Sequence, residues 1–243
     1  MNRISTAGSI AELKSMIEPS GAPLIVVPVH NALHEAVDCL ESLIRHSPEG
    51  VEILVIDDGS NDPLSPELIP SLNQTAFFYL WRRDENLGFV VTMNQAFDAA
   101  GRRDVVLVNS DVVVGPEWLG RLKAAALSDQ RVATATPLTN FGTFLSTPYR
   151  KPTKQLPNGH SVLSAALVVA QASRRRYPDI PVCVGHVVYF RRFALDLVGC
   201  FDEAFSPGYG EEVDFSLRCR AVGLTHVCAD DVFVYHAGGA SFS

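Results

Sequence analysis

The sequence lacks the features that mark secreted, membrane-spanning and nucleic-acid-binding proteins. Its five cysteines include no C-x-x-C pair, are odd in number and lie far apart, so we expect reduced, mostly buried thiols in a cytosolic protein. Residues 1–17 have no apolar signal-peptide core, and no hydrophobic run reaches the length of a membrane helix. Peripheral association with a membrane stays open. The net charge of −7 excludes a general basic field for nucleic acid.

Two phosphate-binding signatures are also absent. The turn after the first expected strand is His30-Asn31-Ala32, with neither a G-x-G-x-x-G nor a P-loop pattern, which argues against a classical dinucleotide site and a Walker-type phosphate cradle. The composition that is present, 47% apolar and 19% charged, is typical of a globular protein with a substantial core. A chain of 243 residues forms one large α/β domain or two small ones.

Strands and helices alternate along the first half of the chain. Apolar runs predict strands over residues 24–29, 51–56, 77–81 and 105–108. Helical spacing predicts helices over 33–45 and 117–127, and a loop followed by a helix between 86 and 100. Residues 4–17 predict a short amphipathic helix that breaks at 19–21. This alternation indicates a parallel sheet covered by helices.

The second half has a different pattern. Residues 136–157 are rich in Pro, Thr, Asn and Gly and predict a long loop, and residues 182–190 are strand-like. Helices are expected over 161–173, 191–198 and 212–221, and a short last strand over 232–235. We expect one domain over 1–243, in which residues 24–135 face a nucleotide and residues 136–243 face an acceptor.

Polar residues follow the apolar strands. The run Val105–Val108 predicts a strand buried on both faces, and it ends in Asn109-Ser110-Asp111. Asp111 would lie at the carboxyl edge of the sheet, where open α/β sheets bind ligands and where a carboxylate suits Mg²⁺ or Mn²⁺. An ordinary polar strand end is the alternative. Asp57-Asp58-Gly59-Ser60 fits either a tight turn or a carboxylate that accepts a hydrogen bond from a nucleobase or ribose.

An acidic cluster, Glu211-Glu212-Val213-Asp214, opens the helix expected near residue 212. Acids at a helix start are favoured by the helix dipole, which is the structural explanation. Three acids within four residues exceed what capping needs, and adjacent carboxylates raise the pKa of one of them, which suits a general base. Arg218 lies four residues after Asp214 and is expected to pair with it. Arg174-Arg175-Arg176 fits solvated surface or a phosphorylated or lipid-diphosphate acceptor.

The ordered set of motifs resembles the family-2 glycosyltransferases, inverting sugar-nucleotide enzymes of the GT-A fold, and within them the bacterial rhamnosyl- and galactofuranosyl-type enzymes. The segments that carry the resemblance extend from residue 24 to near the end of the chain: Ile25–Asn31, Val55–Ser60, Glu85–Phe89 with Asn94, Asn109–Asp111, Gly199–Glu203, Gly210–Phe215 and His236. The resemblance implies an α/β fold with a mixed, mostly parallel central sheet flanked by helices.

The resemblance also implies roles for single residues. The nucleotide would be bound by the residues of the first half: Pro28, Val29, Asn31, Asp57, Asp58, Asn86, Gly88, Asn109 and Ser110. Asp111 matches the last acid of the family's D-x-D motif and His236 a third metal ligand of several members, so together they would hold Mn²⁺ or Mg²⁺. Glu212 matches the catalytic base, and Glu211 and Asp214 would position the acceptor or tune that base. Two departures stand out, because Asn109-Ser110-Asp111 keeps one D-x-D carboxylate and Glu211-Glu212 replaces Glu-Asp.

The function implied is inverting transfer of a sugar from a UDP- or dTDP-type donor to a hydroxyl of a glycan or lipid-linked saccharide. The protein would be cytoplasmic, with or without peripheral attachment to the inner face of a membrane, and would bind no nucleic acid. A sugar-1-phosphate nucleotidyltransferase is disfavoured because His30-Asn31-Ala32 stands where that class has a Gly-rich, basic loop. A nucleotide-sugar-binding module with degenerate activity is the non-enzymatic alternative, and residues 143–180 are expected to select the acceptor.

Overall fold

The computed structural model describes residues 4–17, 20–62, 64 and 76–238. The strands of this part are β1 (Ile4–Ala7), β2 (Leu24–Val29), β3 (Glu52–Asp58), β4 (Phe77–Arg83), β5 (Val105–Val108), β6 (Val112–Val113), β7 (Val132–Thr139), β8 (Asp179–Ile180), β9 (Val187–Phe190) and β10 (Thr225–His236). The α-helices are α1 (Ile10–Met16), α2 (Leu33–His46), α3 (Phe89–Ala99), α4 (Trp118–Ala126), α5 (Val162–Ala172), α6 (Arg192–Val198) and α7 (Glu211–Ala221). Two short 3₁₀ turns are η3 (Thr143–Leu145) and η4 (Glu203–Phe205).

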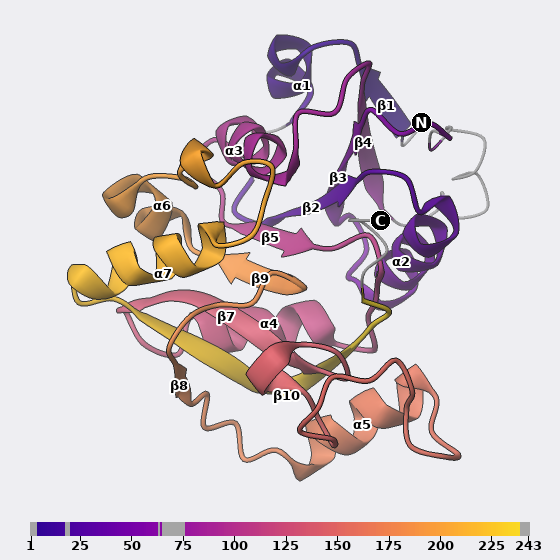
Figure 1. Cartoon of the computed structure of the whole chain (residues 1–243), viewed down its shortest axis with the longest axis vertical. Coiled ribbons are helices and arrows are strands. Elements are labelled where there is room, and N and C mark those ends of the chain that lie inside the picture. The colour runs from indigo at the N-terminus through magenta and orange to yellow at the C-terminus, as the bar shows by residue number, and fades with distance from the viewer. Residues whose placement is uncertain (1–3, 18–19, 63, 65–75, 239–243) are drawn as a thin grey trace.

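One sheet runs through both halves of the chain (Figure 1). Its strand order is β1-β4-β3-β2-β5-β9-β7-β10-β6, and β8 pairs with β10. The strands β1, β4, β3, β2 and β5 are parallel, as are β7 and β10, whereas β9 runs antiparallel to β5 and β7. The expected mixed, mostly parallel sheet is thereby confirmed.

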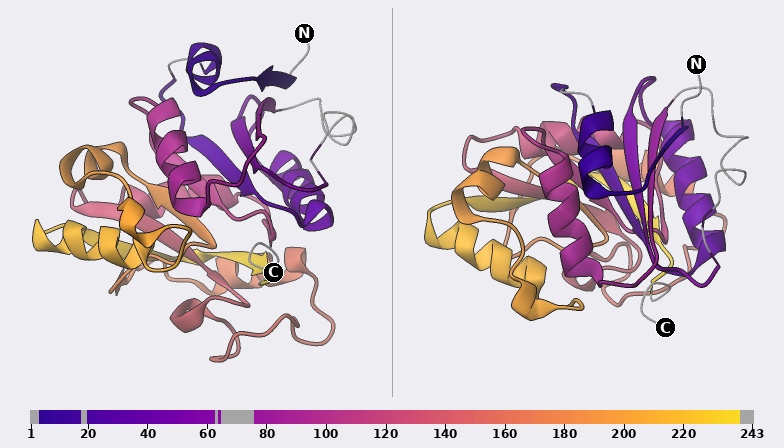
Figure 2. Two further views of the ribbon diagram at one scale, coloured as in Figure 1. Left: turned by 45° about the horizontal axis from the view of Figure 1, so that its top comes forward. Right: turned by 90° about the horizontal axis from the view of Figure 1, so that it is seen from above.

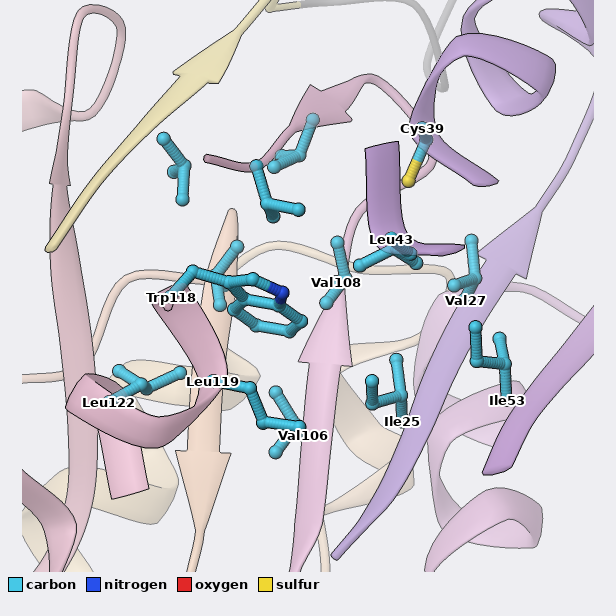
Figure 3. Close-up of a cluster of buried hydrophobic side chains, with 14 of the residues drawn as sticks. Ile25, Val27, Cys39, Leu43, Ile53, Val106, Val108, Trp118, Leu119 and Leu122 are labelled. Atoms are coloured by element: carbon cyan, nitrogen blue, oxygen red, sulfur yellow. The ribbon is translucent and has the colours of Figure 1, made fainter. Parts of the chain in front are cut away.

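The neighbouring strands β2 and β5 consist of apolar residues and pack into the core on both faces of the sheet. In β2, Ile25 and Val27 belong to one hydrophobic cluster, and Leu24 and Val26 belong to the other. Successive side chains of a strand point to opposite faces, so an unbroken apolar run needs a covering layer on each side. Figure 2 shows the helices on both sides of the sheet. In Figure 3, Leu43 of α2 and Trp118 of α4 cover Val106 and Val108 on one of these faces.

Most sequence expectations for the first half are confirmed. The strands over 24–29 and 105–108 begin and end where the apolar runs do, and α2 extends the expected helix by one residue. The five cysteines are free thiols, and four of them are buried. Within the described ranges, no helix is both long enough and apolar enough to cross a bilayer.

Three expectations for secondary structure are wrong. Residues 4–7 form an edge strand paired with β4 rather than the first turn of a helix, and α1 begins only after Ser9, whose side chain accepts a hydrogen bond from the amide of Glu12. The predicted loop over 136–157 starts inside β7, which contains Pro137. The last strand has 12 residues rather than the four expected, because a register irregularity around residues 229–233 interrupts its alternation. Part of the break expected at 19–21 lies outside the described residues.

An aromatic cluster fastens α7 to the sheet. The ring centroid of Phe215 lies 5.5 Å from that of Phe190 on β9 and 6.1 Å from that of Phe201, and the side chain of Phe215 is fully buried. Edge-to-face aromatic contacts of this kind add to the stabilisation from burial. The helix that carries the acidic cluster is thus held rigidly beside the sheet.

We predict that Phe215→Ala lowers the free energy of unfolding by about 3–5 kcal/mol, since truncating a buried aromatic leaves a cavity. Urea denaturation followed by circular dichroism measures the change. The control is Leu217→Ala on the same helix, a side chain that is 58% exposed, and it should change the free energy of unfolding by no more than about 0.5 kcal/mol. Equal losses in both variants would contradict the anchoring role of the aromatic cluster.

Candidate active site

The polar strand ends converge on one cavity of about 570 Å³. It lies where β2 is flanked by β3 on one side and β5 on the other, so that the connections leave the sheet in opposite directions. Such a point is where open α/β sheets bind ligands. Ten of the residues expected to form the site line the cavity: Pro28, Val29, Asp58, Asn86, Gly88, Asn109, Asp111, Glu211, Glu212 and His236.

A larger hollow of about 740 Å³ lies elsewhere, between the end of α2 and the start of α4. Its buried acid, Asp231, is paired with Arg121 and Arg175 at 3.4 and 3.3 Å. None of the predicted site residues lines this hollow. We therefore assign the chemistry to the cavity at the strand ends.

Asp58 forms one wall of the cavity and holds the loop beside it. Its carboxylate accepts hydrogen bonds from the amides of Leu87 at 3.0 Å and Gly88 at 2.9 Å, and from the guanidinium of Arg83 at 2.7 Å. Both side chains of the Asp58–Arg83 pair are almost fully buried. Gly88 has a φ of +85°, and a Cβ on it would meet Pro207 at about 3.0 Å, so glycine suits this position.

His30 extends the same wall, although the sequence did not indicate it. Its Nδ1 donates to the carbonyl of Asp58 at 2.9 Å, which leaves Nε2 as the acceptor for the side-chain amides of Asn86 at 3.0 Å and Asn31 at 3.1 Å. Asn31 therefore supports the wall from behind and does not line the cavity. The amides of two predicted residues thus orient one imidazole.

Asp111 and His236 meet because β6 pairs antiparallel with the end of β10, which sets His236 opposite Val112. The His236 Nε2 atom lies 3.2 Å from Asp111 Oδ1. Its Nδ1 donates to the carbonyl of Phe141 at 2.6 Å, so Nε2 is the ring nitrogen that faces the carboxylate. Two acceptors at this distance repel each other unless a proton or a cation lies between them.

The donor set of Asp111 and His236, one carboxylate and one imidazole, fits a divalent cation such as Mn²⁺. A backbone carbonyl on the far nitrogen is the usual arrangement that orients a metal-binding histidine. The described residues contain no cluster of three or more His, Cys, Asp or Glu side chains suited to a metal. A cation here would therefore take its remaining ligands from a bound phosphate group and from water.

The acid pair Glu211–Glu212 enters the cavity from the start of α7. The helix begins after Gly210, whose φ of +107° and contact with the Phe205 ring leave no room for a side chain. Burial, and next the charge of Glu212, raise the pKa of Glu211 to about 7. The carboxyl group of Glu211 therefore titrates close to neutral pH, as an acid beside another acid can.

Gly185 and His186 belong to the site but were missed. A Cβ on Gly185 would lie 2.2 Å from Glu212 Oε1, so glycine leaves room for that carboxylate in its present position. The Nε2 of His186 donates to the carbonyl of Pro137, and burial and then the charge of His236 lower its pKa to about 3. Its buried Nδ1 has no hydrogen-bond partner among the described residues. A Gly-His pair directly before the buried run 187–190 was the available signal.

Asp57, Ser110 and Asp214 do not line the cavity. The carboxylate of Asp57 accepts from the amides of Ser60 at 3.0 Å and Leu64 at 3.3 Å, so it holds the turn after β3. Asp214 pairs with Arg218 at 2.8 Å, as its spacing predicted. Because residues two apart on a helix face different directions, Asp214 points away from the carboxylate of Glu212.

Comparisons with known proteins are consistent with this geometry. A sequence profile described as "Glycosyl transferase family 2" matches residues 24–199. The hyaluronan synthase of Pasteurella multocida is 25% identical in an alignment 219 positions long, which covers 82% of this chain and 22% of the synthase. Among solved structures, GalNAc-T7 with UDP, GalNAc and Mn²⁺ has a TM-score of 0.66 at 17% identity, covering 90% of this chain and 44% of that chain.

A second similar structure is the mannosyltransferase PcManGT from Pyrobaculum calidifontis in complex with GDP-Man and Mn²⁺. It has a TM-score of 0.60 at 17% identity, and the match covers 95% of this chain and 64% of that chain. The similarity of this chain to GalNAc-T7 and to PcManGT is a similarity of fold. This chain spans about a fifth of the synthase and less than half of GalNAc-T7.

We predict that Glu211→Gln changes how stability depends on pH. The raised pKa means that the folded protein holds a proton on Glu211 that the unfolded chain loses at lower pH, from the ordinary value of 4.5 upward. Wild-type stability should therefore fall, relative to the variant, as pH rises from about 4.5 to about 7. Urea unfolding at several pH values measures the difference, with Glu49→Gln in the exposed turn after α2 as control. Parallel pH curves for wild type and Glu211→Gln would exclude the buried proton.

Proposed function

The chain belongs to glycosyl transferase family 2, and from this membership we propose that it moves a sugar from a nucleoside-diphosphate sugar to an acceptor hydroxyl by a single, inverting displacement. The observation that carries the proposal is the meeting of Asp111, His236 and the Glu211–Glu212 pair in one cavity at the switch point of the sheet. Each group matches one requirement of the reaction, since a diphosphate must leave and a hydroxyl must lose its proton.

We place the donor against the wall built by residues 24–135. Pro28, Val29 and the loop at Asn86 and Gly88 face the cavity beside Asp58, and Asn109 continues this wall toward Asp111. We expect a donor in which the sugar is attached to UDP or dTDP. GalNAc-T7 with UDP and PcManGT with GDP-Man support a nucleoside-diphosphate donor as a class. Asp57 and Asn31 act behind the wall, by holding the turn and His30 in place.

We propose that Asp111 and His236 bind Mn²⁺ or Mg²⁺ together with the donor diphosphate. When bound, the cation neutralises the negative charge that develops on the departing nucleoside diphosphate. The carbonyl of Phe141 keeps His236 Nε2 directed at this position. Asn109 stands where many relatives have an acid, so the chain alone supplies few ligands. Metal binding and nucleotide binding should therefore depend on each other.

Glu212 is the proposed base. Its carboxylate lies in the space left by Gly185, and it would take the proton of the acceptor hydroxyl as that oxygen attacks the anomeric carbon. The bond from that carbon to the diphosphate oxygen breaks on the opposite face, which inverts the configuration. Burial, and next the charge of Glu212, raise the pKa of Glu211 and so favour its protonated form, which suits Glu211 less well to act as the base.

The acceptor would approach from residues 136–243, whose contribution to the cavity includes Phe141, Val184 and His236. We propose a glycan or lipid-linked saccharide as acceptor, selected by residues 143–180. The buried Nδ1 of His186 offers an acceptor to a hydroxyl of either sugar. This division assigns the nucleotide to the first half of the chain and the acceptor to the second.

We predict that Glu212→Gln lowers the transfer rate by about 10²–10⁴-fold, because an amide cannot accept the hydroxyl proton. Donor binding should be unchanged. A panel of UDP-, dTDP- and GDP-sugars in a thermal-shift experiment finds the donor, and product formation with that donor measures the rate. Turnover near the wild-type rate would remove Glu212 from the mechanism, and binding without any turnover in the wild type would favour a binding module.

We predict that Asp111→Asn weakens nucleotide binding in the presence of Mn²⁺ by about 10–100-fold or more, as losing a ligand costs at least as much as losing an outer-shell partner. Binding without metal should change little. Isothermal titration with UDP, with and without Mn²⁺, measures both. Asp214→Asn is the control, because its carboxylate lies outside the cavity. Equal affinities of wild type and Asp111→Asn in Mn²⁺ would refute the metal role.

A further inference from the structure

Helix α5 packs with its small residues inward and its large ones outward. It lies on β10, and its buried residue is Ala166. A Cβ on Gly115 would come within 2.6 Å of the Ala166 Cβ, so the helix sits tightly against the backbone beneath it. A helix on the surface of a globular protein normally turns its large apolar side chains toward the core. Here that arrangement is reversed.

The outward face of α5 is strongly apolar. Leu163, Leu167 and Val168 are 47%, 45% and 51% exposed, and they lie on neighbouring turns of the helix. Phe144 in η3 and Tyr149 in the following loop are also about half exposed. Figure 1 shows η3, this loop and α5 gathered at one end of the molecule, away from α1. Exposed apolar side chains gathered in one part of a molecule mark an interaction surface.

The Lys, Arg, Asp and Glu residues in the same part of the chain are all basic ones. Residues 130–178 contain seven Lys or Arg and no Asp or Glu, whereas the rest of the chain has 13 basic and 27 acidic residues. Of the three consecutive arginines after α5, Arg175 pairs with Asp231. Arg174 and Arg176 are exposed, as are the basic residues of the preceding loop, Arg150, Lys151 and Lys154. A chain of net charge −7 thus carries one surface that attracts anions.

We propose that this α5 surface, formed by residues 143–176, docks on the anionic headgroups of a phospholipid bilayer. Leucines 163 and 167 and Val168 would enter the headgroup boundary, while Arg174, Arg176 and the loop cations contact lipid phosphates. An apolar helix face flanked by Lys and Arg is the chemistry of helices that lie in a membrane interface. With 11 residues, α5 is too short to cross a bilayer and would lie on it.

A second face of the molecule is also apolar, but it differs from the α5 surface in charge. On α6 and α7, Leu197 and Leu217 are 59% and 58% exposed, more than the leucines of α5. Their neighbours Asp196 and Asp214 are acids paired with Arg192 and Arg218, so this face has no excess of positive charge. Of these two apolar faces, the α5 surface is the one that would attract anionic lipid.

Docking by this surface has a consequence for the acceptor, which rests on the proposed function. The loop that bears Lys154 is tied to Asn140, because the side-chain amide of Asn140 donates a hydrogen bond to the carbonyl of Thr153 at 2.7 Å. The same Asn140 donates to the carbonyl of His236 and accepts from its amide. The docking surface is therefore joined directly to the cavity, and a lipid-linked saccharide is the acceptor that this arrangement suits.

The test is co-sedimentation of the purified chain with vesicles of phosphatidylcholine alone or mixed with phosphatidylglycerol. We expect binding to the mixed vesicles that weakens as salt is raised. R174E/R176E should partition at least about 25-fold less, since each basic residue near an anionic surface contributes about five-fold. L163D/L167D should partition at least about ten-fold less, because its apolar side chains are lost from the interface.

Matched controls separate this surface from the rest of the molecule. L197D/L217D and R102E change exposed residues elsewhere and should sediment like the wild type. Glu212→Gln should also sediment normally, so that a failure of the catalytic proposal leaves docking intact. Circular dichroism and UDP binding in Mn²⁺ verify the fold of each variant. Equal binding to both vesicle types, no binding to either, or a dimer in solution that L163D/L167D dissociates would overturn the proposal.

Discussion

The buried ion pair between Asp58 and Arg83 is the interaction on which the cavity depends. Arg83 also donates to Thr92 and Gln95 of α3, and Asp58 receives the amides of Leu87 and Gly88. One pair thus joins β3, β4, the 85–88 loop and α3. Removing one partner of a buried pair typically costs about 3–5 kcal/mol, because the other charge is left without compensation. The wall proposed for the nucleotide is built on this pair.

The reacting groups come from elements far apart in the chain, and each is held by a different contact. Pairing of β6 with β10 sets His236 beside Asp111, the aromatic cluster around Phe215 fixes α7, and the absence of a side chain at Gly185 admits Glu212. The second half of the chain adds both the side of the cavity that we propose for the acceptor and the basic, apolar α5 surface. The proposed donor site and the proposed membrane-docking surface thus lie on neighbouring parts of the molecule, since α5 packs on β10, the strand that ends at His236.

Elements with strong local patterns could be predicted, and elements that depend on distant partners could not. The apolar runs of β2 and β5 need no context, because a strand buried on both faces has a near-continuous hydrophobic sequence. Residues 4–7 become a strand only because the edge of β4 offers its hydrogen-bonding groups. In β10, Asp230 and Asp231 interrupt the pattern, and their cost is offset by contacts with Ser173 and with Arg121, residues remote in sequence.

The sequence by itself determined which chemical groups stand at the strand ends, and it did so through order along the chain. Asp58, Asp111 and His236 were identified in this way, as was Glu212 at the start of a helix, and all four line the cavity. Tertiary structure alone decided which neighbours join them. It turned Asp57 toward the amides of its own turn and Asp214 toward Arg218, and it brought His30 and His186 into the wall. Residues that are adjacent in the sequence can point their side chains in different directions. The direction of each side chain is set by the packing of the element on which it lies.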